Sequence, residues 1–266
     1  MPTYSIIKHL VPDVLKDSFV EFSEDSATQD FIIQQPKKSL SFFKSIFESL
    51  LSLILPAYEV EGLLRLEPMY LLSEEQWRLL LKEKIGGVLL DVGAGQGFMT
   101  SKAKSIFKKI YTTETSHSLA RRLRQQGFEC FEKDLGETIS FIDQRFDAIS
   151  LLNVLDRCDY PLSLLKNCIS LLKPDGYLLI ATPLPLHPYV RKVMYNKRPR
   201  QSLSQITSEI WEECLIHFYE QVIQKNNLEV VRWTRLPYVW KGTGNSYIES
   251  FDDAVIVCRK ITNDSF

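Results

Sequence analysis

A glycine-rich stretch from Gly93 to Gly97 follows the apolar run Val88–Val92 and precedes a segment with helical periodicity. Glycines at this point let the backbone approach a ligand closely, where open α/β sheets bind theirs. Glu114 lies about 20 residues beyond the first glycine, at the end of the next apolar run, where a carboxylate can accept hydrogen bonds from both ribose hydroxyls. The sequence therefore predicts a nucleoside site. Its residues are Gly93, Ala94, Gly95, Gly97 and Glu114.

The spacing of the glycines discriminates between nucleoside cofactors. It lacks the G-x-G-x-x-G form that brings a pyrophosphate to a helix N-terminus, and the Asp91 carboxylate just before it would repel a pyrophosphate. Asp91 can instead orient the loop amides or, through water, the ammonium of an amino-acid tail. S-adenosylmethionine therefore fits better than a nicotinamide dinucleotide. Asp134, after the third apolar run, is a candidate adenine contact, and a solvated loop carboxylate explains it equally well.

Asn153 and Asp156 follow the apolar run Phe146–Leu152 directly. At the end of a strand beside the glycine stretch, their side chains would face the methyl group of the cofactor. The alternative is that they cap a helix that begins at Pro161. Their place beside the predicted methyl donor favours a role in catalysis.

Short apolar runs alternate with helical segments from Gly87 onward, the pattern of βα units around a parallel sheet. The predicted strands are Val88–Val92, Ile110–Thr113, Glu129–Glu132, Phe146–Leu152, Gly176–Thr182, Glu229–Arg235 and Phe251–Arg259, and the predicted helices are Phe98–Phe107, Ser118–Gln126, Pro161–Leu172 and Ile206–Asn226. A turn is expected at Lys173–Gly176. The predicted fold is the α/β, class I (Rossmann-like) methyltransferase fold, with a seven-stranded, mostly parallel sheet in residues 86–266.

Residues 1–85 form a predicted helical extension packed on this core. The segment Leu40–Leu55 has apolar residues at the period of one helical face, among them Phe43, Phe47 and Ile54. We expect this face to pack on the main domain; the alternative is a helix on a membrane surface. The segment is too short, and carries too many charges, to span a bilayer. Ser73 to Gln76 has the form of a capping box that opens another helix.

The charges, the cysteines and the N-terminus of the chain indicate which partners, metals and compartments to expect. Its 32 basic and 33 acidic residues are interspersed and give a net charge of −1, which disfavours nucleic acid as a partner. Five cysteines without a C-x-x-C pair predict neither a zinc site nor a disulfide framework, so no metal is expected. No export signal is visible at the N-terminus, so we expect an intracellular, cytoplasmic monomer, with an organelle surface as the alternative location.

Four segments together make a recognisable pattern: Leu90–Gly95, Leu152–Asp159, Pro185–Val190 and Arg235–Tyr238. They resemble the DREV family, which includes a protein-histidine methyltransferase, and the resemblance runs from roughly Ser18 to Lys260. It implies transfer of a methyl group from S-adenosylmethionine to the pros nitrogen of histidine in H-x-H peptides with a small middle residue. The chain departs from the family before Asp252, where Tyr247 lies farther upstream than the family's tyrosines. Arg191 also stands where an acidic residue is expected.

Histidine methylation requires control of the tautomer, because only the ring nitrogen without a proton can attack. Asp156 is the predicted acceptor of the N–H on the distal nitrogen, and Asn153 would position the ring or the amino-acid end of the cofactor. Histidine attack needs no strong base, so we expect His187 to line the pocket or bond to backbone rather than carry a proton. The predicted substrate-binding residues are Asp156, Arg157, His187, Tyr189, Tyr238 and Tyr247; the tyrosines at 189 and 238 have core packing as their alternative.

Two other functions stay open at this point. The same fold can methylate another nitrogen or a small molecule, since fold alone does not specify a substrate. A cofactor-binding interaction protein without turnover is the third possibility, and the presence of Asp91, Glu114, Asn153 and Asp156 argues against it.

Overall fold

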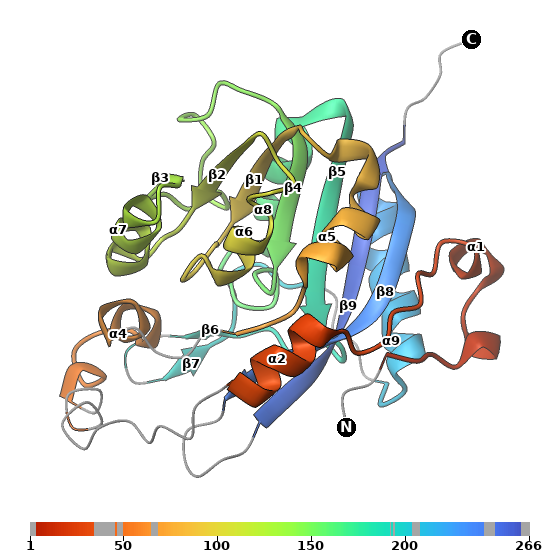
Figure 1. The fold of residues 1–266 in the computed structure, drawn as a ribbon, viewed down its shortest axis with the longest axis horizontal. Coiled ribbons are helices and arrows are strands. Elements are labelled where there is room, and N and C mark those ends of the chain that lie inside the picture. The colour runs from red at the N-terminus through yellow and green to blue at the C-terminus, as the bar shows by residue number, and fades with distance from the viewer. Residues whose placement is uncertain are drawn as a thin grey trace.

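A computed structural model describes residues 4–34, 46, 50–64, 69–191, 193, 195–203, 208–241 and 248–261 of the chain. A seven-stranded sheet with the order β3-β2-β1-β4-β5-β9-β8 lies at its centre (Figure 1). The strands are β1 (Val88–Val92), β2 (Lys109–Thr113), β3 (Glu129–Phe131), β4 (Phe146–Leu152), β5 (Leu172–Pro183), β8 (Leu228–Lys241) and β9 (Ile248–Lys260). Neighbouring strands from β3 to β5 are parallel, whereas β9 is antiparallel to both β5 and β8. This confirms the predicted class I methyltransferase fold.

Helices cover both faces of the sheet, and alternate side chains of each strand supply two hydrophobic clusters. Leu90, Ile149 and Ile180 belong to the cluster that includes residues of α8 (Pro161–Leu171) and α9 (Trp211–Phe218). Leu89 and Ala148 belong to the other, with residues of α5 (Glu74–Leu80) and α7 (His117–Gln125). α2 (Ser26–Gln34) and α5 lie in front of the sheet in Figure 1. Both faces are thus buried, as the continuous apolar runs of the parallel strands require.

The boundaries of β1, β4 and the start of α8 agree with the sequence prediction. The capping box is also confirmed: Gln76 N–H donates to the Ser73 hydroxyl at 3.2 Å, and Ser73 N–H donates to the Gln76 side chain at 2.9 Å. The ends of these elements could be predicted because the sequence marks them locally, either by the limits of a buried apolar run or by a helix cap.

Three predicted boundaries were wrong. Lys173–Gly176 does not form a separate turn before a strand, because it lies inside β5 as an irregularity, where Leu172 pairs with Phe146 and Tyr177 with Ala148. The helix predicted from Phe98 ends at Lys102 as α6 (Phe98–Lys102), and turns then carry the chain to β2. The helix predicted over Ile206–Asn226 begins only at Trp211, and it changes to a π turn at Tyr219–Ile223 and a 3₁₀ turn at Gln224–Asn226; residues 206 and 207 lie outside the described ranges.

The N-terminal region contacts the outer edge of β8 at two places. Val20 N–H donates to the Trp233 carbonyl at 2.8 Å, and Tyr70 exchanges backbone hydrogen bonds with Val239 at 2.8 Å in both directions. The indole of Trp233 also donates to the Leu15 carbonyl at 2.7 Å. These contacts cover an edge that would otherwise expose unpaired backbone groups. The boundary at residue 85 stays a prediction.

The remaining short elements include η1 (Lys8–Leu10), α1 (Asp13–Lys16), α4 (Ala57–Leu64), η2 (Lys82–Lys84) and the hairpin of β6 (Val190–Arg191) and β7 (Asn196–Lys197). Much of the predicted helix Leu40–Leu55, including Phe43 and Phe47, lies outside the described residues. At three of the described positions of this face the expected burial is wrong, since Ile46, Leu50 and Ile54 are 41%, 56% and 70% exposed, whereas Leu51 is half-buried. No helix in the described ranges is long and apolar enough to cross a membrane.

Candidate active site

The glycine loop joins β1 to α6 through three glycines in the left-handed region. Gly93, Gly95 and Gly97 have φ values of 66°, 54° and 75°, which L side chains rarely adopt. A Cβ at Gly93 would lie 2.8 Å from the Val154 side chain, so the loop packs closely on the segment after β4. At Gly95, the nearest heavy atom beyond its chain neighbours would be the Gly93 carbonyl oxygen at 4.0 Å. The backbone at Gly95 therefore faces open room.

Glu114 follows β2 and holds the glycine loop in place. Its carboxylate accepts backbone N–H groups from Gly95 at 2.9 Å, Thr115 at 2.8 Å and Ser116 at 3.0 Å. The side chain is buried, and burial raises its pKa while the three N–H groups lower it. An ionised carboxylate has about four acceptor positions, so Glu114 retains capacity for a ligand hydroxyl at the edge of the open room beside Gly95.

Asp91 is buried at the end of β1 and ties three elements together. Its two carboxylate oxygens accept the hydroxyls of Thr100 on α6 and Ser150 on β4, each at 2.6 Å. Burial raises the pKa of this carboxyl. The expectation that Asp91 orients loop amides is therefore wrong: Ala94 N–H donates to the Thr113 carbonyl at 3.1 Å, and the Gly95 amide is held by the carboxylate described above. Contact of Asp91 with an ammonium through water stays a prediction.

Asp134 lies in the turn after β3 and is half-buried. Its carboxylate accepts the Gly136 N–H at 2.7 Å, which closes the turn. Burial raises its pKa. The turn explains one oxygen of Asp134, and its contact with adenine stays a prediction.

Asn153 begins the segment after β4 with a strained backbone. Its φ is 55°, in the left-handed region that is uncommon for residues other than glycine, and its N–H donates to the Ala181 carbonyl at 2.9 Å. The side chain is buried, yet neither its oxygen nor its nitrogen has a hydrogen-bond partner among the described residues. Buried polar atoms are nearly always bonded, and strained residues cluster at functional sites. Asn153 is thus placed to bind a ligand.

Asp156 is buried one turn further on, 2% exposed. Its Oδ2 accepts the Nε–H of Arg157 at 3.1 Å, whereas its Oδ1 has no partner in the described part of the chain. The alternative that Asn153 and Asp156 cap the following helix is excluded, because the residue before α8 is Tyr160 and no side chain caps it. The arginine fixes one oxygen of Asp156 and leaves the other available.

Tyr238 on β8 lies against the same segment. The Arg157 guanidinium carbon is 5.6 Å from the centre of its ring, a cation–π contact, and its hydroxyl contacts the Met69 sulfur. Burial raises the pKa of Tyr238 to about 12, so its hydroxyl stays protonated. The structure therefore brings Tyr238 to Arg157 and buries it in a hydrophobic cluster, and its contact with a substrate stays a prediction.

The segment that contains His187 is attached to the Asp156 loop through its backbone, since Tyr189 N–H donates to the Asp156 carbonyl at 2.9 Å. Tyr189 is half-buried. The His187 side chain is exposed and makes no hydrogen bond to any described residue, so the expected bond to backbone is not found. Arg191, in β6, is exposed. Tyr247 lies outside the described residues.

Asp253 is a residue of this region that the sequence did not single out. It lies on β9 opposite Pro183 and Leu236, it is 0% exposed, and neither of its carboxylate oxygens has a hydrogen-bond partner in the described ranges. Burial raises its pKa well above the usual value; the Asn153 amide lowers it and the charge of Asp156 raises it. A charged residue inside the apolar strand Phe251–Arg259 was the signal that could have identified it.

All five cysteines are free, as predicted. Among the described residues, no group of three His, Cys, Asp or Glu side chains could hold a metal ion. The polar side chains of the site are its carboxylates, Asn153 and Arg157, and they lie beside the open glycine loop.

The curated proteins that the chain matches include ubiquinone biosynthesis O-methyltransferases. That of Coxiella burnetii (strain RSA 493 / Nine Mile phase I) is 30% identical over 135 residues, covering 48% of this chain and 55% of the relative. That of Histophilus somni (strain 2336) is 30% identical over 104 residues, covering 35% and 44%. The chain thus spans about half the length of the curated relatives it matches.

Solved structures with a similar fold include the N-methyltransferase NodS from Bradyrhizobium japonicum WM9 in complex with S-adenosyl-L-homocysteine. It is 15% identical to this chain with a TM-score of 0.47, covering 71% of this chain and 86% of NodS. A complex of DhpI with S-adenosylhomocysteine is 14% identical with a TM-score of 0.49, covering 69% and 81%.

The family model of the DREV methyltransferases matches residues 4–260, nearly the whole chain. The site fits the methyl donor S-adenosylmethionine, since open room lies beside Gly95 and a buried carboxylate with spare acceptor capacity stands at Glu114. The chain belongs to the DREV methyltransferase family.

Proposed function

We propose that the chain is a protein-histidine N-pros-methyltransferase that acts on H-x-H segments with a small middle residue. The observation that carries this proposal is the buried, unpartnered Oδ1 of Asp156 beside the unpartnered side chain of Asn153. Both follow β4, and Val154 between them packs against the glycine loop. Polypeptides that carry H-x-H segments would be its partners.

A neutral imidazole, with a pKa of about 6.5, is a competent nucleophile near neutral pH, through the ring nitrogen that carries no proton. When bound, S-adenosylmethionine supplies an electrophilic methyl group. Asp156 Oδ1 accepts the N–H of the distal nitrogen, which leaves the lone pair of the pros nitrogen available and stabilises positive charge on the ring. The bond from Arg157 to Oδ2 holds the carboxylate in this orientation.

The residues of the glycine loop and Glu114 would hold the cofactor. The open face of Gly95 admits it, the remaining acceptor position of Glu114 takes a ribose hydroxyl, and Asn153 orients its amino-acid end or the acceptor ring. Asp134 would contact the adenine.

The curated relatives are named O-methyltransferases, which suggests an oxygen, such as that of a phenol, as the alternative acceptor. A phenol has a pKa of about 10 and must lose its proton to become a good nucleophile. The charge of Asp156, and of Asp253 when it is ionised, opposes formation of a phenolate, whereas a carboxylate favours a ring that becomes cationic. The charges of the site therefore favour a nitrogen acceptor over an oxygen acceptor. A protein that bound the cofactor without turnover would have no use for unpartnered polar atoms on the acceptor side.

The proposal is tested by incubating the protein with methyl-labelled S-adenosylmethionine and, separately, with peptides containing His-Ala-His, His-Ala-Ala or a single lysine, and with a catechol. Mass spectrometry then locates the label. We expect strong labelling of His-Ala-His and weak or no labelling of the other three. Labelling of lysine or the catechol without labelling of histidine would reject the histidine proposal and leave the methyltransferase assignment intact.

A further inference from the structure

Asp253 combines complete burial with an unsatisfied carboxyl group. It is 0% exposed, and neither Oδ1 nor Oδ2 has a hydrogen-bond partner among the described residues. A buried carboxyl without partners is costly to fold. Native proteins retain such groups where a ligand or another function requires them.

The side chains around Asp253 give its carboxyl group neither a hydrogen bond of standard geometry nor a close cation among the described residues. Burial is the largest cause that raises the pKa of Asp253, and the charges of Asp156 and Asp252 raise it further. A hydrogen-bonding interaction with the Asn153 amide and the charge of Arg157 lower it, but the amide does not reach standard hydrogen-bond geometry. Arg157 donates its Nε–H to Asp156 and stacks on Tyr238, so its contacts are directed elsewhere. Asp253 thus lacks the close cation that would make it a structural ion pair.

The unpartnered atoms of this region form one group. They belong to Asn153 (Oδ1 and Nδ2), Asp156 (Oδ1) and Asp253 (Oδ1 and Oδ2). Asp253 and Asp156 interact electrostatically but do not form a hydrogen bond with each other. A ligand that donates hydrogen bonds and gains positive charge suits the carboxyl oxygens of this group and the Asn153 Oδ1, whereas an anion would be repelled by ionised carboxylates.

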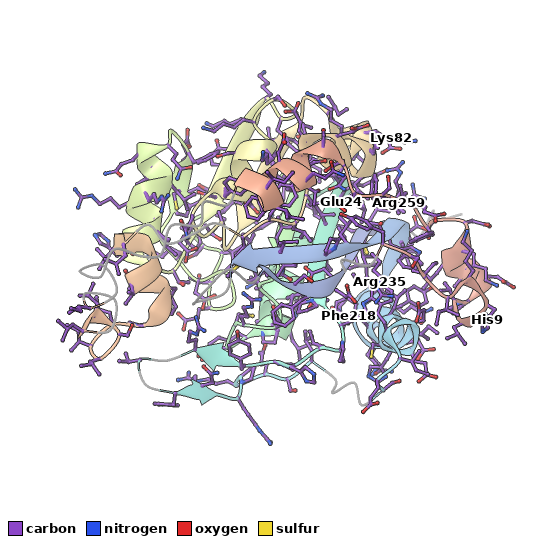
Figure 2. All side chains as sticks on the ribbon, turned by 60° about the horizontal axis from the view of Figure 1, so that its bottom comes forward. His9, Glu24, Lys82, Phe218, Arg235 and Arg259 are labelled. Carbon is purple, nitrogen blue, oxygen red and sulfur yellow. The ribbon has the colours of Figure 1, made fainter. Side chains whose placement is uncertain are left out.

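The adjacent Asp252 shows what a structural carboxyl in the same strand looks like. Successive side chains of a strand point to opposite faces, and Asp252 accepts a hydrogen bond from Arg235 at 2.7 Å. Arg235 in turn stacks on Trp211 of α9, 4.5 Å from the ring centre; Arg235 is labelled in Figure 2, as is Phe218 of α9. Asp252 is therefore paired on the α9 face, whereas Asp253, on the other face, is unpaired.

We propose that Asp253 is a second acceptor-side carboxyl, which together with Asp156 binds the N–H groups of the nitrogen base that receives the methyl group. This inference rests on the proposed function for the identity of the base, a histidine side chain. The Asn153 amide interacts with Asp253 and belongs to the same group of side chains. Two carboxyls explain how the site can hold a histidine ring that becomes cationic without a counter-ion from solvent.

The test compares Asp253→Asn with wild-type protein, using calorimetry to measure peptide binding in the presence of S-adenosylhomocysteine. Asparagine has nearly the same shape as aspartate but carries no charge. Its side-chain N–H₂ group would also point a hydrogen-bond donor at the N–H of the histidine ring. We expect the affinity for the His-Ala-His peptide to fall about 10-fold or more, with the affinity for S-adenosylhomocysteine within about 2-fold of wild type. Because removal of an unpaired buried carboxyl relieves a folding cost, the midpoint of thermal unfolding should stay unchanged or rise.

Asp252→Asn is the matched control, and it should leave peptide affinity unchanged. If Asp253→Asn does not fold, Asp253→Leu, which fills the volume without polar atoms, repeats the comparison. Unchanged peptide affinity in the folded variant, or equal losses of peptide and S-adenosylhomocysteine affinity, would overturn the role of Asp253. If wild type binds a lysine peptide instead of His-Ala-His, the proposed function fails, and the same comparison on the lysine peptide still decides the role of Asp253. If wild type binds neither peptide, both proposals are overturned.

Discussion

Replacement of Asp156 by alanine is expected to lower the rate of methyl transfer to a His-Ala-His peptide by about 100-fold or more. The substitution removes the carboxylate oxygen that selects the reactive tautomer and stabilises the cationic ring. Affinity for S-adenosylhomocysteine should change little, because the glycine loop and Glu114 hold the cofactor. Single-turnover labelling of the peptide, with calorimetry for S-adenosylhomocysteine, measures the two effects separately.

Asp143→Ala provides the control for Asp156, since Asp143 is an exposed aspartate before β4 and outside the site. It should leave both measurements unchanged. If Asp156→Ala weakened cofactor binding as much as turnover, Asp156 would belong to the cofactor site and its role in tautomer selection would be wrong.

Gly95→Arg should abolish measurable binding of S-adenosylhomocysteine. A side chain at Gly95 projects into open room, with no heavy atom beyond its chain neighbours nearer than 4.0 Å. Arginine would fill that room and bring a cation to the site that would hold a cofactor which itself carries a sulfonium and an ammonium. The left-handed backbone at this position, with φ of 54°, adds a strain of about 1–2 kcal/mol for any residue with a Cβ.

Gly86→Arg is the control that separates backbone strain at a glycine from blockage of the cofactor site. Gly86 has φ of 82° and an equally open surrounding, but it precedes β1 at the end of the strand opposite the glycine loop. We expect Gly86→Arg to lose stability in denaturant unfolding by about the same amount as Gly95→Arg, and to bind S-adenosylhomocysteine normally. Normal binding by Gly95→Arg would show that the cofactor does not lie on this loop.

The centre of the fold could be predicted from the sequence because its signals are local. β1 and β4 are buried on both faces and read as continuous apolar runs, and the glycines after β1 mark the turn. The capping box at Ser73 needs only four residues to be recognised. Positions such as Glu114 and Asp156 followed from these strands, because side chains at the carboxyl ends of parallel strands share one edge of the sheet.

Features that depend on distant pairing could not be predicted. Asp253 reaches the site because β9 runs antiparallel to β5 and brings a late residue back to the edge where the parallel strands end. The partners of Asp91, Thr100 and Ser150, come from two other elements, so the sequence could show its carboxylate but not its bonds. The apolar period around Leu50 indicated a helical face without showing what lies against it, and the exposure of Leu50 corrected that expectation.

The central claim is that Asp156 selects one ring nitrogen of a histidine for methylation. Nuclear magnetic resonance of the methylated His-Ala-His peptide distinguishes N-methylation at the pros nitrogen from methylation at the distal one. We predict methylation at the pros nitrogen alone. A product methylated at the distal nitrogen, or a mixture of the two in comparable amounts, would contradict the proposed hydrogen bond between Asp156 and the distal N–H.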